Sequence, residues 1–105
     1  MMNMNKELFA EAVKGTKPVL VEFWAPWCTY CRRIAPVLPK VEDQWKDQVT
    51  IAQVNIDDHP EIAQQEQIEL IPTLVVYREG KSLGSIVAPD SKAKIDALIE
   101  ECLKK

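Results

Sequence analysis

The sequence is poor in cysteine, in basic residues and in long hydrophobic runs, and each shortage excludes a class of protein. Three cysteines in 105 residues are too few, and odd in number, for a small secreted domain built on disulfides. No apolar run approaches the roughly 20 residues that a membrane-spanning helix needs. Thirteen Lys and Arg against sixteen Asp and Glu give a net charge of −3 and a pI near 5.1. Proteins that bind nucleic acid or anionic membranes are usually basic, so neither partner is expected.

What remains is the composition of an ordinary globular protein. Hydrophobic residues make up 47% of the chain and charged residues 28%, which argues against disorder. Residues 1–105 contain no repeat, linker or low-complexity tract, and this length suits one domain with one core. The first residues lack the charged-then-apolar pattern of a signal peptide, so we expect a cytoplasmic protein.

Apolar spacing and helix-capping residues predict alternating strands and helices. The expected elements are an edge strand at 2–4, a helix capped by Asn5 and ended by Gly15, strands at 19–24, 49–56, 73–78 and 82–87, helices at about 28–45 and 57–66, and a last helix capped by Ser91. The strand at 19–24 is apolar on both faces, as in a central parallel strand. The order β-α-β-α-β-α-β-β-α indicates an α/β fold with a central mixed sheet flanked by helices on both faces.

Two prolines interrupt the long helical pattern at 28–45. Pro36 should kink this helix, and Pro39 follows three residues later, so we expect its middle to be irregular. The side chains predicted to fill the core are Val19, Val21, Phe23, Trp45, Val54, Ile56, Leu74 and Val76.

The pair Cys28 and Cys31 carries the chemistry that the sequence predicts. Two cysteines three residues apart can close a small disulfide ring across one helical turn. Cys28 falls at the start of the predicted helix, where unpaired backbone N–H groups favour a thiolate, the reactive form of cysteine. We therefore expect Cys28 to attack a disulfide and Cys31 to resolve the mixed disulfide that forms.

Two other interpretations of the cysteine pair are a half zinc site and inert core cysteines. A structural zinc needs four ligands, and only Cys102 and His59 remain as donors, without paired ligand spacing. Cys102 lies on the apolar stripe of the last helix and is predicted to be a small core residue. His59 is predicted to be solvated, with no ligand or base partner. No metal site is expected.

Two segments resemble the signatures of the thioredoxin family, and the resemblance covers nearly the whole chain. Residues 24–36, Trp-Ala-Pro-Trp-Cys-Thr-Tyr-Cys-Arg-Arg-Ile-Ala-Pro, resemble the active-site segment, and Ile71-Pro72-Thr73 resembles the cis-proline loop. The resemblance implies the thioredoxin fold and thiol–disulfide exchange on disulfide-containing protein substrates. It also implies that Cys28 is the nucleophile and Cys31 the resolving cysteine.

The same resemblance implies a substrate face around the cysteine pair. Pro72 would be cis and would face the cysteines, and the Ile71 backbone would pair with an extended substrate segment. The residues expected on this face are Trp27, Thr29, Tyr30, Ile71, Pro72 and Ala88. The chain departs from the family at Thr29-Tyr30, where Gly-Pro is usual, and at Leu70 and Ala88, where glycine is usual. The added side chains should narrow the groove or make it more apolar.

Glu22 interrupts the apolar strand just before the cysteine pair. A buried, unpaired carboxylate is unfavourable, so we expect a raised pKa and a role as proton acceptor for Cys31. The alternative is an acid at the end of a strand that reaches solvent. Thioredoxins usually carry Asp at this position, and Gln53 stands where the family typically has a nearby Lys. Loss of that cation should raise the pKa of Glu22 further.

The sequence thus supports three functions in order of preference. The first is a monomeric, cytoplasmic protein-disulfide reductase that an external reductase, such as thioredoxin reductase, regenerates and that needs no metal or organic cofactor. The second is a disulfide oxidase or isomerase, which would need an oxidising compartment. The third is a binding module that uses the Pro72 groove without turnover, against which the intact Cys28 and Cys31 argue.

Overall fold

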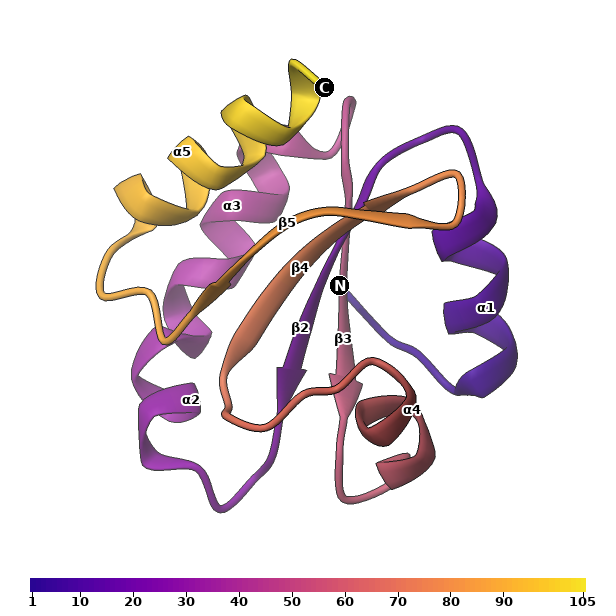
Figure 1. Ribbon diagram of the computed structural model, residues 1–105. Helices are drawn as coiled ribbons and strands as arrows, with labels where there is room; N and C mark the ends of the chain where they lie inside the picture. The colour runs from indigo at the N-terminus through magenta and orange to yellow at the C-terminus, as the bar shows by residue number, and fades with distance from the viewer.

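A computed structural model describes residues 1–105 and shows five strands and five α-helices. The strands are β1 (Met2–Asn3), β2 (Val19–Trp24), β3 (Thr50–Asn55), β4 (Thr73–Arg78) and β5 (Lys81–Val87). The helices are α1 (Lys6–Lys14), α2 (Thr29–Ile34), α3 (Leu38–Trp45), α4 (Pro60–Gln65) and α5 (Lys92–Leu103), with a 3₁₀ turn η1 (Ala35–Val37) between α2 and α3. The predicted order of elements is confirmed (Figure 1). None of the helices is long and apolar enough to cross a membrane.

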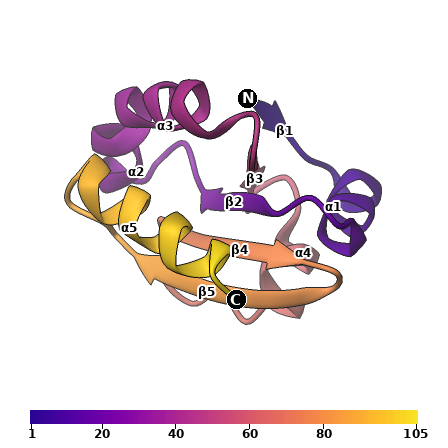
Figure 2. The ribbon, with the colours of Figure 1, turned by 90° about the horizontal axis from the view of Figure 1, so that it is seen from above.

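The five strands form one mixed sheet in the order β1-β3-β2-β4-β5. The central strand β2 runs parallel to β3 and antiparallel to β4. Viewed from above, α2, α3 and α5 lie on one face of the sheet, and α1 and α4 lie on the other (Figure 2). This layered arrangement confirms the predicted α/β fold.

Strand β2 is apolar on both faces because helices cover both faces. Leu20 packs in the cluster formed with α3 and α5. Val21 and Phe23 pack in the cluster formed with α1 and α4, and all three side chains are fully buried. Of the predicted core residues only Ile56 is half-buried, because β3 ends at Asn55 and Ile56 follows in the turn.

The predicted helix at 28–45 is divided into α2, η1 and α3. Pro36 lies in the 3₁₀ turn, and Pro39 lies in the first turn of α3, where a missing N–H costs nothing. The predicted irregularity is confirmed. The expected start of the helix at Cys28 is off by one residue, because Cys28 is the N-cap and adopts extended backbone angles.

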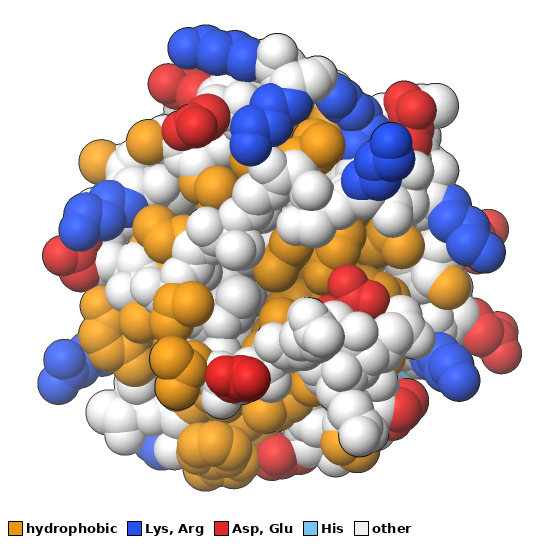
Figure 3. All heavy atoms as spheres, in the orientation of Figure 1, with side chains coloured by type: hydrophobic (Ala, Val, Ile, Leu, Met, Phe, Trp, Pro, Cys, Tyr) orange, Lys and Arg blue, Asp and Glu red, His pale blue; other side chains and the backbone are white.

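The outer part of the sheet is incompletely covered on the side of α1 and α4. A hollow of about 330 Å³ lies there between the segment 66–70 and the strands β4 and β5. Figure 3 shows apolar side chains at the floor of this hollow, between the ribbon positions of β4 and α4. The exposed residues on this side of β5 include Ser82 and Ser85, as expected for a strand face without a covering helix.

Candidate active site

The turn after β2 places Cys28 at the N-terminus of α2. The Cys28 backbone N–H donates to the Ala25 carbonyl oxygen over 3.2 Å, which closes the turn. The Cys28 Sγ accepts the backbone N–H of Cys31 at 3.1 Å, so the sulfur itself caps the helix. The sulfur therefore lies where the unpaired N–H groups of the first helical turn converge. The strand, the turn and the cap together present a nucleophilic sulfur.

Cys31 lies one helical turn further on and is held as a protonated thiol. Both Cys28 and Cys31 are buried and carry free thiols. The pKa of Cys31 is raised to about 12, mainly by burial and also by a hydrogen bond with the Cys28 side chain and the charges of Cys28 and Glu22. A backbone hydrogen bond with Ala25 opposes part of this rise. The two thiols therefore differ in environment. Cys28 caps α2, whereas Cys31 is desolvated behind it.

The loop before β4 lies against the nucleophilic sulfur. The Ile71–Pro72 peptide bond is cis, as predicted. The Cys28 thiol lies 3.8 Å from the Ile71 carbonyl oxygen, within hydrogen-bond distance for sulfur. The Ala88 N–H donates to the Pro72 carbonyl oxygen at 2.8 Å and so joins the end of β5 to this loop. Ala88 adopts a φ of 46°, a left-handed conformation in which glycine is favoured.

Glu22 is buried behind Cys31, with a side chain only 2% exposed. Its Oε1 accepts the Gln53 Nε2 at 2.8 Å, and its Oε2 has no hydrogen-bond partner. Burial raises the pKa of Glu22 to about 7, and the bond from Gln53 opposes part of that rise. Glu22 and Cys31 line the same 240 Å³ cavity. The raised pKa is confirmed, and the alternative of a solvated strand-end acid is excluded.

Comparison with known proteins agrees with this geometry. The family model described as Thioredoxin matches residues 1–101. The chain is 37% identical over 103 residues to a thioredoxin of Alicyclobacillus acidocaldarius subsp. acidocaldarius, covering 98% of each chain. It is 40% identical over 93 residues to a thioredoxin of Acidithiobacillus ferridurans, covering 89% of this chain and 86% of the relative. The crystal structure of the Malassezia sympodialis thioredoxin Mala s 13 superimposes with a TM-score of 0.85 at 31% identity, covering 96% of this chain and 89% of that one.

The chain belongs to the thioredoxin family. The protein is accordingly a thiol–disulfide oxidoreductase, as the Cys-x-x-Cys geometry indicates. A further relative is the bifunctional thioredoxin reductase/thioredoxin of Mycobacterium leprae, which is 38% identical over 87 residues; these cover 83% of this chain but 19% of that protein.

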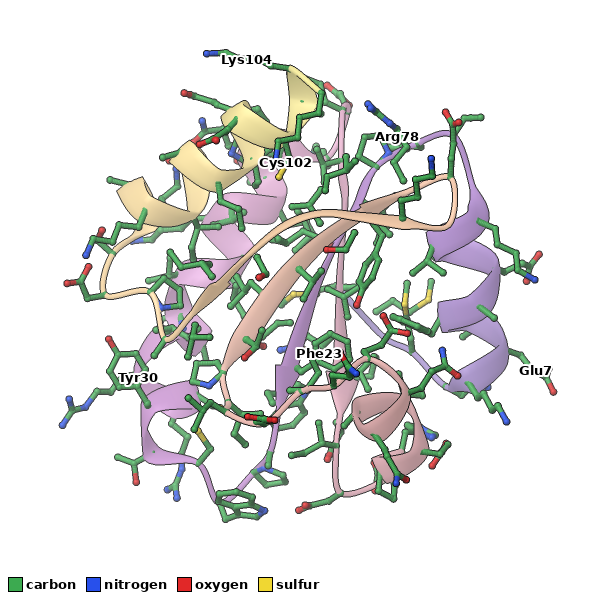
Figure 4. The ribbon with its side chains drawn as sticks, in the orientation of Figure 1. Glu7, Phe23, Tyr30, Arg78, Cys102 and Lys104 are labelled. Carbon is green, nitrogen blue, oxygen red and sulfur yellow. The ribbon has the colours of Figure 1, made fainter.

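Side chains around the thioredoxin-type cysteine pair form a partly apolar rim. Trp27 is 62% exposed, and its Nε1 donates to Asp57 Oδ1 at 3.1 Å. The Tyr30 hydroxyl donates to the Pro89 carbonyl oxygen at 3.5 Å, and Figure 4 shows Tyr30 at the surface beside the loop between β5 and α5. Thr29 is exposed at the first position of α2. Asp57 was not predicted, although it lies two residues after the end of β3, which is parallel to β2, and this place could have indicated it.

The remaining candidate donors are Cys102 and His59. Cys102 is buried in the core and points from α5 toward the sheet (Figure 4). A Cβ atom on Gly84 of β5 would come within 2.9 Å of the Cys102 Sγ, so the glycine makes room for the sulfur. His59 is half-buried, and its Nδ1 lies 3.6 Å from Glu61 Oε1 on the first turn of α4, beyond hydrogen-bond distance. No cluster of three or more His, Cys, Asp or Glu side chains is placed to hold a metal ion.

Proposed function

We propose that the protein reduces disulfide bonds of protein substrates, with Cys28 as nucleophile and Cys31 as resolving cysteine. The observation that carries this proposal is the contrast between the two sulfurs. The Cys28 Sγ accepts a backbone N–H at the start of α2, whereas desolvation keeps Cys31 protonated. The proximity of the Cys28 sulfur to the Ile71 carbonyl supports the same assignment, because a substrate segment that pairs with this backbone lies next to the nucleophile.

The exchange proceeds in two balanced steps. The Cys28 thiolate attacks one sulfur of the substrate disulfide, forms a mixed disulfide and releases the other substrate sulfur, which takes up a proton. Cys31, having passed its proton to Glu22, then attacks the Cys28 sulfur as a thiolate. The mixed disulfide breaks, and the second substrate sulfur leaves as a thiolate that takes up a proton. Two electrons pass from the protein dithiol to the substrate, and the protein keeps a Cys28–Cys31 disulfide.

Glu22 accepts the proton of Cys31 in the second step. In the mixed disulfide the Cys28 sulfur carries no negative charge and no longer accepts a hydrogen bond from Cys31. Two of the causes that raise the pKa of Cys31 are therefore lost. The Glu22 Oε2 is free of other hydrogen bonds, and both side chains line one cavity. A carboxyl group with a pKa of about 7 can take up and return a proton near neutral pH.

The substrate face consists of the residues that surround the Cys28 sulfur. In this proposal Trp27, Thr29 and Tyr30 contact the substrate from the side of α2, and Ile71, Pro72 and Ala88 contact it from the opposite loops. The exposure of Trp27 and the link between Ala88 and Pro72 support the assignment.

We further propose that residues 1–105 act as a single domain and a monomer in a reducing compartment such as the cytoplasm. The free thiol of Cys102, buried away from the cysteine pair, suits a reducing compartment. A thioredoxin reductase is proposed to regenerate the dithiol, since the Mycobacterium leprae relative joins a reductase and a thioredoxin in one chain. Neither a metal nor an organic cofactor enters the proposed steps.

Reduction of insulin by dithiothreitol, with the protein as catalyst, tests the proposal. Cys28→Ser should abolish the catalysed rate, and Cys31→Ser should accumulate a covalent adduct with insulin that mass spectrometry assigns to Cys28. Cys102→Ser is the matched control and should retain the wild-type rate. A Cys28→Ser variant with full activity would overturn the proposal, and a non-catalytic binding module would then account for the fold.

A further inference from the structure

The hollow beside β4 and β5 begins at the proposed substrate face. Leu70 directly precedes Ile71, and Val87 directly precedes Ala88, whose N–H is bonded to the Pro72 carbonyl oxygen. Both Leu70 and Val87 line the hollow. An extended chain advances roughly 3.3 Å per residue, so a substrate segment that lies along Ile71 reaches the hollow within a few residues of its cysteine.

Two of the residues that line the hollow are unusually exposed apolar side chains. Leu70 is 64% exposed and Val87 is 48% exposed, while Ile68, Val75 and Tyr77 line the hollow further in. Exposed aliphatic side chains that adjoin a cavity and an active site gain free energy when a partner covers them.

The charged residues that line the hollow are all acidic. Glu66 and Glu69 belong to the segment between α4 and β4, and no lysine or arginine lines the cavity. The Tyr77 hydroxyl donates to Glu66 Oε1 at 2.8 Å and fixes that carboxylate at the wall. Figure 3 shows acidic side chains at the rim of the hollow around its apolar floor. A basic side chain that enters there meets favourable charges.

We propose that the hollow binds the flank of the substrate segment and selects disulfides that lie in apolar, basic sequences. An aliphatic residue of the substrate covers Leu70 and Val87, and a Lys or Arg next to it approaches Glu69 and Glu66. This inference rests on the proposed reductase function and adds the class of substrate to it. The occupant is the substrate itself, because the hollow is continuous with the backbone that adjoins Cys28.

The test uses short peptides that differ only around one cysteine, which is joined by a disulfide to 2-mercaptoethanol. In the reference peptide Leu and Lys flank the cysteine on each side; in two others Glu replaces Lys, or Ser replaces Leu. Second-order rate constants for reduction by the reduced protein are measured by mass spectrometry at low salt and at 0.5 M salt. We expect the reference peptide to react about threefold faster than the Glu peptide at low salt, with the difference lost at high salt. It should also react about fivefold faster than the Ser peptide at both salt concentrations.

Two variants of the protein assign these preferences to the hollow. Glu69→Lys should reverse the preference between the Lys and Glu peptides, and Leu70→Ser should remove the preference for Leu over Ser. Glu100→Lys is the matched control, because it makes the same charge change at an exposed position of α5, on the opposite face of the sheet. It should preserve both preferences.

The small neutral disulfide bis(2-hydroxyethyl) disulfide separates this inference from the proposed function. If the wild-type protein does not reduce it, the exchange chemistry itself is absent and the proposed function fails. If the protein reduces it but shows equal rates for the three peptides, the chemistry stands and the inference is overturned. A dimer in sedimentation experiments that Leu70→Ser dissociates, with equal peptide rates, would show that a second copy fills the hollow and would also overturn it.

Discussion

Glu22 is the residue at which stability and function are most directly opposed. It occupies a β2 position that lies between the fully buried Val21 and Phe23, where an apolar side chain would pack without penalty. Its carboxyl group instead has one hydrogen-bonded oxygen and one without a partner. The structure thus holds a destabilising group next to the thiol that must lose a proton, which is typical of a functional residue.

Replacement of Glu22 by Gln should remove a pH-dependent loss of stability. The unfolded chain releases the Glu22 proton near pH 4.5 and the folded protein releases it near pH 7, so the folded state holds one more proton in this range. The stability of the wild-type protein therefore falls as the pH rises through this window, by ~3 kcal/mol in total. Glu22→Gln cannot ionise, and denaturant unfolding at pH 8 should show it more stable by up to that amount, with little difference at pH 4.

A matched variant and a kinetic measurement complete this test. Glu100→Gln changes an exposed carboxylate and should show no such pH-dependent gain. Glu22→Gln should also slow the release of substrate from the mixed disulfide by ~100-fold in rapid-mixing experiments, because the proton acceptor is lost. Equal stability of Glu22→Gln and wild type across pH 4–8 would contradict a raised pKa for Glu22.

The β4–β5 hairpin has a turn in which one residue, Glu79, disfavours the backbone conformation that the turn requires. Arg78 pairs with Lys81, so Glu79 and Gly80 form a two-residue loop, and both have positive φ values of 53° and 79°. Such a loop prefers Asn-Gly. Glu79→Asn should stabilise the protein by about 0.5–1 kcal/mol in denaturant unfolding. Glu79→Ala serves as the control, since it removes the charge without favouring positive φ, and it should bring no such gain. A gain equal in both variants would mean that the charge, and not the turn, matters.

The elements also show how far the sequence could predict the structure. Local signals were sufficient for the caps at Asn5 and Ser91 and for the break near Pro36, because neighbouring residues decide these features. The contacts of Trp27 with Asp57 and of Ala88 with Pro72 join segments that are far apart in the sequence. No local pattern encodes such contacts, so the sequence indicated candidate residues around the cysteine pair but neither Asp57 nor the contacts that hold these residues in place.

At the scale of the whole molecule, the sheet determines both the site and the hollow. Parallel β2 and β3 end at the same edge, and β4 begins there, so the Cys28 turn and the Pro72 loop meet. The hollow was not predicted, because it arises where the helices α1 and α4 leave the outer strands uncovered. The strongest sequence signal, a Cys-x-x-Cys that follows a buried strand, indicated thiol–disulfide exchange. The direction of electron flow was not predictable in this way, because it depends on the relative stabilities of the dithiol and disulfide forms of the folded protein.

The reduction potential of the Cys28–Cys31 pair decides whether the protein donates electrons to substrate disulfides or accepts them. The protein would be equilibrated in thiol–disulfide buffers of known composition, and free thiols counted by alkylation and mass spectrometry, with Cys102→Ser used to remove the third thiol. We expect a potential near the thioredoxin value of about −270 mV, at which the dithiol donates electrons in a reducing compartment. A value of about −180 to −120 mV would show a pair that donates its disulfide instead, and would contradict the assignment as a reductase.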